Sequence, residues 1–239
     1  MLTTYLKQST ISIIKVYNGL LNIQCIYCLQ DSQTNICPDC LDALPLLGQH
    51  CPKCSAPNHH GQLCGHCLSV PPAFDEVLCP FEYQPPISDL IHSWKSRQHT
   101  QGVEVLIQRL IETLSTHDFD VIIPVPYHWQ KLLKRGQNPV RTLAKQLSKQ
   151  LHTPLIDAVI RTKLGIAQQG LDRKKRITNL HGVFDLKPRK RLSFKHKNIL
   201  LVDDVVTTGT TCNHISKLLK GAGAHSVTIA CLARTPAKG

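Results

Sequence analysis

The sequence of 239 residues is poor in acidic and aromatic side chains: 16 Asp and Glu stand against 28 Lys and Arg, and aromatic residues make up only 5%. It also lacks the uninterrupted apolar run of roughly 20 residues that crosses a membrane, because Lys15, Asn18 and Asn22 break the N-terminal stretch. That stretch has no small-residue cleavage site, so we expect no membrane insertion, no export and a cytoplasmic location. The pattern GxxxxGK followed by Ser or Thr does not occur, which excludes a P-loop nucleotide site.

The net charge of +12 is unevenly distributed along the chain. Residues 1–80 hold three Lys and Arg and five Asp and Glu, a net charge of −2, so residues 81–239 carry +14. Ten Lys and Arg lie in the block Arg173–Lys197. Such a block suits polyanions, either phosphorylated metabolites or nucleic acid, and it also occurs as a plain solvated surface.

Cysteine is abundant, and eight of the eleven cysteines form CxxC pairs. Two residues between cysteines let both thiolates meet one tetrahedral ion, and two such pairs complete a four-sulfur zinc site. Disulfides are the alternative, but a cytoplasmic location disfavours them. The sequence therefore predicts two structural zinc ions. The predicted ligands are Cys25, Cys28, Cys37, Cys40, Cys51, Cys54, Cys64 and Cys67.

The pairing of the four CxxC motifs stays open at the level of the sequence. Two ribbons in series close the shortest loops, while a cross-braced arrangement uses the same eight ligands. Nearby histidines are interpreted as bystanders, because eight cysteines fill two tetrahedral sites, and the filled sites favour structural or docking use over catalysis. These histidines are His50, His59, His60 and His66.

The chain after the cysteines alternates between strand-like and helix-like patterns. Apolar residues recur with a 3.6-residue period over 103–114 and again after Asn138 and Pro139, which predicts two helices. A further helix begins near Thr211 and stops around Gly221 or Gly223. Strands are expected at 121–125, 155–160, 199–202 and 227–232. This alternation predicts an α/β fold with a parallel sheet flanked by helices.

Three regions follow from these patterns. We expect an N-terminal helical segment over residues 1–24, the double zinc ribbon over 25–70, and the α/β domain over 81–239. A proline-rich passage separates the second region from the third.

The stretch "NILLVDDVVTTGTT" ends a buried strand with two adjacent carboxylates, Asp203 and Asp204, and continues with small hydroxyl residues. Adjacent carboxylates repel each other, and a nearby metal ion or ligand hydroxyls can offset this repulsion. Gly209 permits a close backbone turn, and the amides at the start of the next helix favour an anion. The stretch is thus suited to hold a phosphate beside a diol. Cys212 follows the loop, but no base accompanies it, so we interpret it as a small buried residue.

The stretch resembles the phosphoribosyl diphosphate (PRPP) motif of type I phosphoribosyltransferases, and nearly the full chain resembles the ComF family, which includes ComFC and GntX-like competence proteins. The likeness also rests on the CxxC ribbons, "IHSWKSRQ", "VIIPVPYHWQKLLKRGQN", "RTKLGIAQQGLDRKKRITNLHGVF" and the terminal "LAR". The resemblance implies a type I phosphoribosyltransferase-like parallel sheet flanked by helices, with the double zinc ribbon at its N-terminal side.

The resemblance also implies roles for single residues. Asp203 and Asp204 bind the ribose hydroxyls, directly or with Mg²⁺, and are the catalytic candidates. The 5-phosphate is assigned to Thr207, Thr208, Gly209, Thr210 and Thr211. The diphosphate is assigned to the loop around Pro126 and Tyr127, to the basic element of Arg135, and to a cover that contains Arg161, Gln169, Arg173 and Lys174.

Three functions fit these features. The first is Mg²⁺-assisted transfer of ribose 5-phosphate from PRPP to an unidentified acceptor, in a protein of DNA uptake and natural transformation, as the resemblance implies. The second keeps PRPP or a nucleotide as a regulatory signal without catalysis. The third is a zinc-ribbon adaptor that binds single-stranded DNA and helicase or recombination partners.

Overall fold

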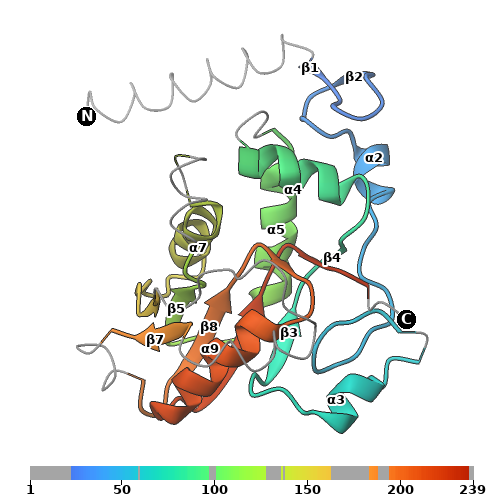
Figure 1. Ribbon diagram of the computed structural model, residues 1–239. Coiled ribbons are helices and arrows are strands. Elements are labelled where there is room, and N and C mark those ends of the chain that lie inside the picture. The colour runs from blue at the N-terminus through green and yellow to red at the C-terminus, as the bar shows by residue number, and fades with distance from the viewer. Residues whose placement is uncertain are drawn as a thin grey trace, which may run out of the picture.

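The computed structural model describes residues 23–58, 60–96, 101–127, 136, 138–162, 183–187 and 194–236. A parallel sheet with helices on both faces forms the larger part of the protein, and the cysteine-rich segments lie along one side of it (Figure 1). Among the described helices, none has the length and apolar character needed to cross a membrane.

Four parallel strands form the central sheet in the order β3-β10-β8-β5. Val202 pairs with Pro124 on one side and with Ala230 on the other, so three strands end level with one another. The strands are rich in Val, Ile and Leu and are almost wholly buried, as expected of a sheet covered on both faces. Their bounds are β3 Glu76–Leu78, β5 Val121–Pro124, β8 Asn198–Val202 and β10 Ser226–Ala230.

Three of these strands continue after a short break into a second parallel sheet, in the order β4-β11-β9. The backbone bridges the break, because the Asp203 N–H donates to the Ala230 carbonyl (2.9 Å) and the Leu232 N–H donates to the Asp204 carbonyl (3.0 Å). The acidic pair therefore lies at a bend that both neighbours hold in place. The strands are β4 Phe81–Glu82, β9 Val205–Val206 and β11 Ala233–Arg234.

Four longer helices cover the sheet. Helix α9 lies on one face, while α5 and α7 pack together on the other, with α4 against α5 (Figure 1). Each buries its apolar stripe, and the Asn138 side chain caps α7 by accepting a hydrogen bond from the Arg141 N–H (3.1 Å). The predicted helices over 103–114, after Asn138, and from Thr211 to Gly221 are confirmed. The helices are α4 Ile87–Ser96, α5 Val103–Leu114, α7 Pro139–Gln150 and α9 Thr210–Gly221.

Of the predicted strand over 155–160, only the end is confirmed, since Val159 and Ile160 lie in a strand. Only Leu155 bridges to β5, where Ile122 exchanges backbone hydrogen bonds with Pro154 and Ile156. The chain then turns away, and β6 (Val159–Arg161) pairs antiparallel with β7 (Phe184–Leu186) outside the main sheet. The apolar pattern of this segment indicates an extended backbone, but it does not identify the strand with which the segment pairs.

The connection between the two predicted modules also contributes to the sheet, because β3 lies within residues 71–80 and forms an edge strand beside β10. The cysteine-rich part contains the antiparallel pair β1 (Ile23–Gln24) and β2 (Asp31–Ser32) and the short helices α2 (Pro38–Asp42) and α3 (Gly65–Ser69). Apart from β1, the expected N-terminal helical segment lies outside the described residues.

Candidate functional site

The candidate ligand site lies where the direction of the chain across the sheet reverses. After β5 the chain moves outward through α7, while after β8 it moves the opposite way through α9 to β10. The Val125 N–H donates to the Val202 carbonyl (2.9 Å), so the loops that leave β5 and β8 begin side by side. Ligands of open parallel sheets bind at such a crevice beyond the carboxyl ends of the strands.

The two aspartates differ in their surroundings. Asp204 is only 8% exposed and forms an ion pair with Lys95 of α4, with 2.8 Å between its Oδ1 and the lysine Nζ. Asp203 is partly exposed, and its Oδ1 accepts a hydrogen bond from the Asp204 N–H (2.8 Å). The pair thus presents one carboxylate toward solvent and one that is balanced by a cation.

The loop after β9 leads directly into α9. Gly209 adopts φ +73°, a left-handed conformation that favours glycine, and it serves as the N-cap residue of the helix. The Thr208 and Thr210 hydroxyls hydrogen-bond to each other (2.8 Å) on the exposed side of the loop. Predicted residues Thr207 to Thr211 therefore surround the amino end of a helix of twelve residues, where backbone N–H groups lack helical partners.

The other predicted ligand residues are distributed as follows. Pro126 and Tyr127 follow β5 and are partly buried at the crevice. Arg161 ends β6, where its guanidinium lies over the Phe184 ring at 5.6 Å from the ring centre. The remaining predicted residues lie outside the described part of the chain; they are Arg135, Gln169, Arg173 and Lys174.

Cys212 lies in the first turn of α9 and is fully buried. Burial raises the pKa of its thiol well above the usual range, and the nearby Asp203 charge raises it further. The thiol is therefore protonated at neutral pH, which fits the interpretation of a packing residue and opposes one as a nucleophile.

The eight CxxC cysteines form two clusters of four in which all sulfur atoms lie within 4.8 Å of one another. The first contains Cys25, Cys28, Cys37 and Cys40, and the second contains Cys51, Cys54, Cys64 and Cys67. Sulfur separations of 3.7 Å occur in both. Tetrahedral zinc with Zn–S bonds of about 2.3 Å requires sulfurs about 3.8 Å apart, so both clusters fit the ion. The pairing is sequential, and no histidine of the described residues belongs to either cluster.

In each cluster, the pKa of one cysteine thiol is lowered, which favours its thiolate form. Burial alone would raise the pKa of the Cys25 thiol, but surrounding backbone N–H groups, including that of Cys37 at 3.4 Å, bring it down to about 6. The same balance brings the pKa of Cys51 to about 7, with the Cys64 N–H at 3.4 Å from its sulfur. Since zinc binds the thiolate form, these amides favour the metal-bound state.

Purified protein should contain two zinc ions per chain, because each of the two clusters supplies four sulfur ligands at zinc geometry. Elemental analysis after gel filtration measures the ratio. Alkylation of the native protein is the control, since the eight clustered thiols should react only after chelation. A ratio near one, with one quartet freely alkylated, would contradict two closed sites.

The sequence does not predict the contacts of two residues in the site region, Lys95 and Arg234, from their residue types. Lys95 lies far from Asp204 in the sequence, and only its place in "IHSWKSRQ" marked it. Arg234 of the terminal "LAR" is 5% exposed and hydrogen-bonds to carbonyl groups beside the 207–211 loop. A lysine at the end of an amphipathic helix and an arginine in an apolar strand were the available signals.

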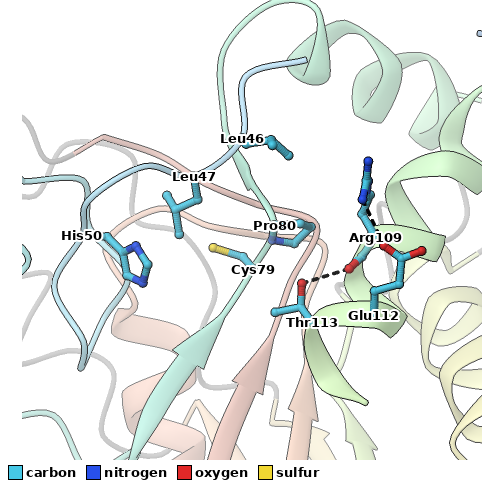
Figure 2. Close-up of a pocket in the computed structure, with 8 residues that line it drawn as sticks. All are labelled: Leu46, Leu47, His50, Cys79, Pro80, Arg109, Glu112 and Thr113. Carbon is cyan, nitrogen blue, oxygen red and sulfur yellow. Dashed lines mark hydrogen bonds and ion pairs between the residues drawn. The ribbon is translucent and has the colours of Figure 1, made fainter. Parts of the chain in front are cut away.

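A separate cavity of about 310 Å³ lies between the zinc-ribbon segment and α5 (Figure 2). Cys79 and Pro80 lie between Leu47 on one side and Thr113 on the other, and none of the predicted ligand residues lines this cavity. The segment that borders it runs along β4, since Leu46 forms an antiparallel bridge with Phe81 and the Glu82 N–H donates to the Pro45 carbonyl (3.1 Å). The cavity therefore lies between the segment that joins the two cysteine clusters and the α/β domain.

Two family models match the sequence, the phosphoribosyl transferase domain over residues 94–239 and the double zinc ribbon domain over residues 16–68. Together they span both the crevice of the parallel sheet and the two cysteine clusters.

Two curated proteins and one solved structure illustrate what this chain is similar to. Competence protein F of Haemophilus influenzae is 33% identical over 228 residues, which cover 89% of this chain and 97% of that protein. DNA utilization protein YhgH of Escherichia coli is 34% identical over 209 residues, covering 84% and 90%. The solved purine phosphoribosyltransferase of Pyrococcus horikoshii is 26% identical over 55% of this chain and 72% of its own, with a TM-score of 0.37.

Proposed function

Because the chain belongs to the ComF family, in which a double zinc ribbon precedes a phosphoribosyl transferase domain, we propose that it binds PRPP at the crevice between β5 and β8. The observation that carries the proposal is the placement of Asp203 and Asp204 beside the 207–211 loop at this crevice. PRPP has a 5-phosphate, a cis-diol and a diphosphate. The loop, the acidic pair and the segment around Pro126 are suited to these three groups in turn.

We propose that the three groups of PRPP contact successive parts of the crevice. Backbone N–H groups at the start of α9 donate hydrogen bonds to the 5-phosphate, aided by the Thr208 and Thr210 hydroxyls. The more exposed Asp203 carboxylate faces the ribose hydroxyls. Lys95, whose ammonium lies 2.8 Å from the Asp204 carboxylate, is assigned to the diphosphate. Arg161 and the basic residues that follow it in the sequence are assigned to cover the diphosphate.

A divalent cation fits the chemistry of these residues. Carboxylate oxygens are preferred by Mg²⁺, which is usually held by one or two carboxylates together with phosphate oxygens and water. Asp203 and Asp204 supply two carboxylates, and the described residues contain no group of three or more acids that would form a complete site alone. Mg²⁺, when bound with PRPP, would neutralise charge on the departing diphosphate.

We further propose that the site transfers ribose 5-phosphate to an acceptor. The anomeric C–O bond breaks, the diphosphate leaves with the bonding electrons, and the acceptor bonds to the anomeric carbon from the opposite face. The acidic pair stabilises the cationic sugar, and basic side chains stabilise the leaving group. Purified protein incubated with PRPP, Mg²⁺ and single candidate acceptors should release pyrophosphate. Binding without release under all conditions would instead support a PRPP sensor.

Lys95→Met should weaken PRPP binding by about tenfold, because a charge-assisted contact to the diphosphate is lost. The affinity for ribose 5-phosphate, which has no diphosphate, should fall less. Calorimetric titration of both ligands measures the difference. Lys149→Met, an exposed lysine at the end of α7, is the matched control. Equal losses for both ligands would show that Lys95 acts only by holding Asp204.

A role in DNA uptake or DNA use is the second part of the proposal, and the names of the two relatives and the charge of +14 on residues 81–239 favour it. We propose that the basic block Arg173–Lys197 contacts nucleic acid, with helicase or recombination proteins as further partners. The zinc ribbons are the candidate docking elements, since eight cysteines leave no open metal position for catalysis.

Replacing Arg173, Lys174, Lys175 and Arg176 together by alanine should weaken binding of single-stranded DNA and flatten its dependence on salt, because fewer counterions are released. Fluorescence anisotropy over a range of salt concentrations measures both effects. The wild-type slope is the reference, and a four-alanine variant with an unchanged slope would remove this block from the DNA-binding surface.

A further inference from the structure

Arg234 lies at the centre of a hydrogen-bonded junction. The residue is 5% exposed, and the described hydrogen-bond partners of its guanidinium are all backbone carbonyl groups. Nε donates to Cys54 (2.8 Å), and Nη1 donates to Val206 (3.0 Å), Thr235 (2.8 Å) and Thr207. A buried charge requires several such partners to offset the loss of water, so each carbonyl is held firmly toward the guanidinium.

Three of the partners of Arg234 belong to two features that lie 152 residues apart in the sequence, from Cys54 to Val206. Cys54 is a ligand of the second zinc cluster, and Val206 and Thr207 are the residues at which β9 passes into the phosphate loop. One side chain therefore ties the backbone of a zinc ligand to the backbone of the loop that we assign to the 5-phosphate.

Further contacts tie the second ribbon to β3 and tie the segment that follows the ribbon to the region of the loop. The Ser55 hydroxyl donates to the Val77 carbonyl of β3, next to the zinc ligand Cys54. The Ala73 N–H donates to the Asn213 side chain in the first turn of α9 (2.7 Å). The Phe74 ring lies below the loop, 3.7 Å from the position of a β-carbon on Gly209.

The first ribbon makes different contacts. Tyr27 donates to the Pro86 carbonyl at the start of α4 (3.5 Å), and Ile26 packs where a β-carbon on Gly102 would lie, just before α5. None of the described hydrogen bonds joins the first ribbon to residues 205–211. The two zinc clusters therefore support different parts of the α/β domain.

We propose that Arg234 is a positioning residue for the phosphate loop and that it makes the shape of this loop depend on zinc in the second cluster but not in the first. The inference rests on the proposed function for the role of the loop in ligand binding. Zinc fixes the backbone at Cys54, the Cys54 carbonyl holds the guanidinium, and the guanidinium holds the carbonyls of Val206 and Thr207. Loss of zinc from the second cluster frees the backbone at Cys54. The guanidinium of Arg234 then no longer holds the loop in place.

The test compares zinc-ligand variants of equal burial. Cys64→Ser in the second cluster and Cys40→Ser in the first both replace half-buried ligands. Hydrogen exchange measured by mass spectrometry reports on residues 205–211 with or without a ligand. Exchange in this segment should increase in Cys64→Ser and stay at the wild-type level in Cys40→Ser. Equal exchange in both variants, or no change in either, would overturn the inference.

Arg234 itself is tested by Arg234→Met and Arg234→Lys, with zinc content measured first. Both should retain two zinc ions, and exchange in 205–211 should increase more in Arg234→Met than in Arg234→Lys, since lysine keeps the charge and part of the donor set. Ribose 5-phosphate should bind at least about tenfold more weakly to Arg234→Met, the cost of one lost charged hydrogen bond. Pyrophosphate, assigned to the loop after β5, should bind as in the wild type.

The outcomes separate the inference from the proposed function. Wild-type protein that binds neither PRPP nor ribose 5-phosphate contradicts the proposed function, while exchange in 205–211 still decides whether Arg234 links zinc to the loop. If the wild-type protein binds these ligands and Arg234→Met shows the same affinity and the same exchange in 205–211, the inference is overturned and the proposed function stands. If Arg234→Met does not fold, the exchange and affinity of Arg234→Lys give the same decision.

Discussion

Gly209→Val should reduce binding of ribose 5-phosphate and of PRPP below detection. Gly209 adopts φ +73°, and a residue other than glycine in this region costs roughly 1–3 kcal/mol, with β-branched residues at the upper end. The added side chain would also press against Phe74 and Val206, whose atoms lie 3.7 and 3.9 Å from the β-carbon position. The loop must then adopt another shape, and its N–H groups no longer converge on the phosphate.

Gly221→Val is the matched control for this substitution. Gly221 ends α9, its β-carbon position has no atom within 4 Å, and its φ is not in the left-handed region. Binding of both ligands to Gly221→Val should therefore equal that of the wild type. Calorimetry, with circular dichroism to verify the fold, measures the two variants. Wild-type affinity in Gly209→Val would remove the 207–211 loop from the ligand site.

The double variant Asp203→Asn, Asp204→Asn should bind PRPP at least tenfold more weakly, and its dependence on Mg²⁺ should diminish. Each lost charge-assisted hydrogen bond to the ribose hydroxyls costs roughly 1.5–3 kcal/mol. Asparagine keeps the shape of aspartate and the oxygen that accepts the Asp204 N–H at position 203. The loop for the 5-phosphate stays intact, so some affinity for ribose 5-phosphate should remain.

The single variants should differ in stability because of Lys95. Its ion pair with Asp204 is mostly buried, with side-chain exposures of 17% and 12%, so Asp204→Asn leaves a cation without its carboxylate and should lower the melting temperature. Asp203→Asn should not. Combining Asp204→Asn with Lys95→Met measures the coupling of the pair.

Asp89→Asn, an exposed acid on α4, is the control for removal of one negative charge. Its affinity for PRPP should match that of the wild type at each Mg²⁺ concentration. A double asparagine variant that also binds like the wild type would show that the acidic pair is not the ribose site, and the proposed transfer would lose its main support.

The sequence by itself determined the features that depend on neighbouring residues. Two thiolates separated by two residues can share an ion in any context, so the four CxxC pairs predicted the zinc clusters. Helical periodicity over 103–114 and the Asn138–Pro139 start signal needed no tertiary partner to be recognised. The order of strand, acidic pair, glycine turn and helix from Asn198 onward was equally local, because each step lies within a few residues of the next.

The tertiary structure alone decided which distant groups meet. It chose sequential over cross-braced zinc clusters, placed Leu155 rather than a whole strand at the edge of β5, and brought Lys95 to Asp204. It also joined Arg234 to Cys54, which lie 180 residues apart. Residue type limits what a side chain can bind, but the choice among distant partners depends on the packing of the whole core, and no local pattern contains that information.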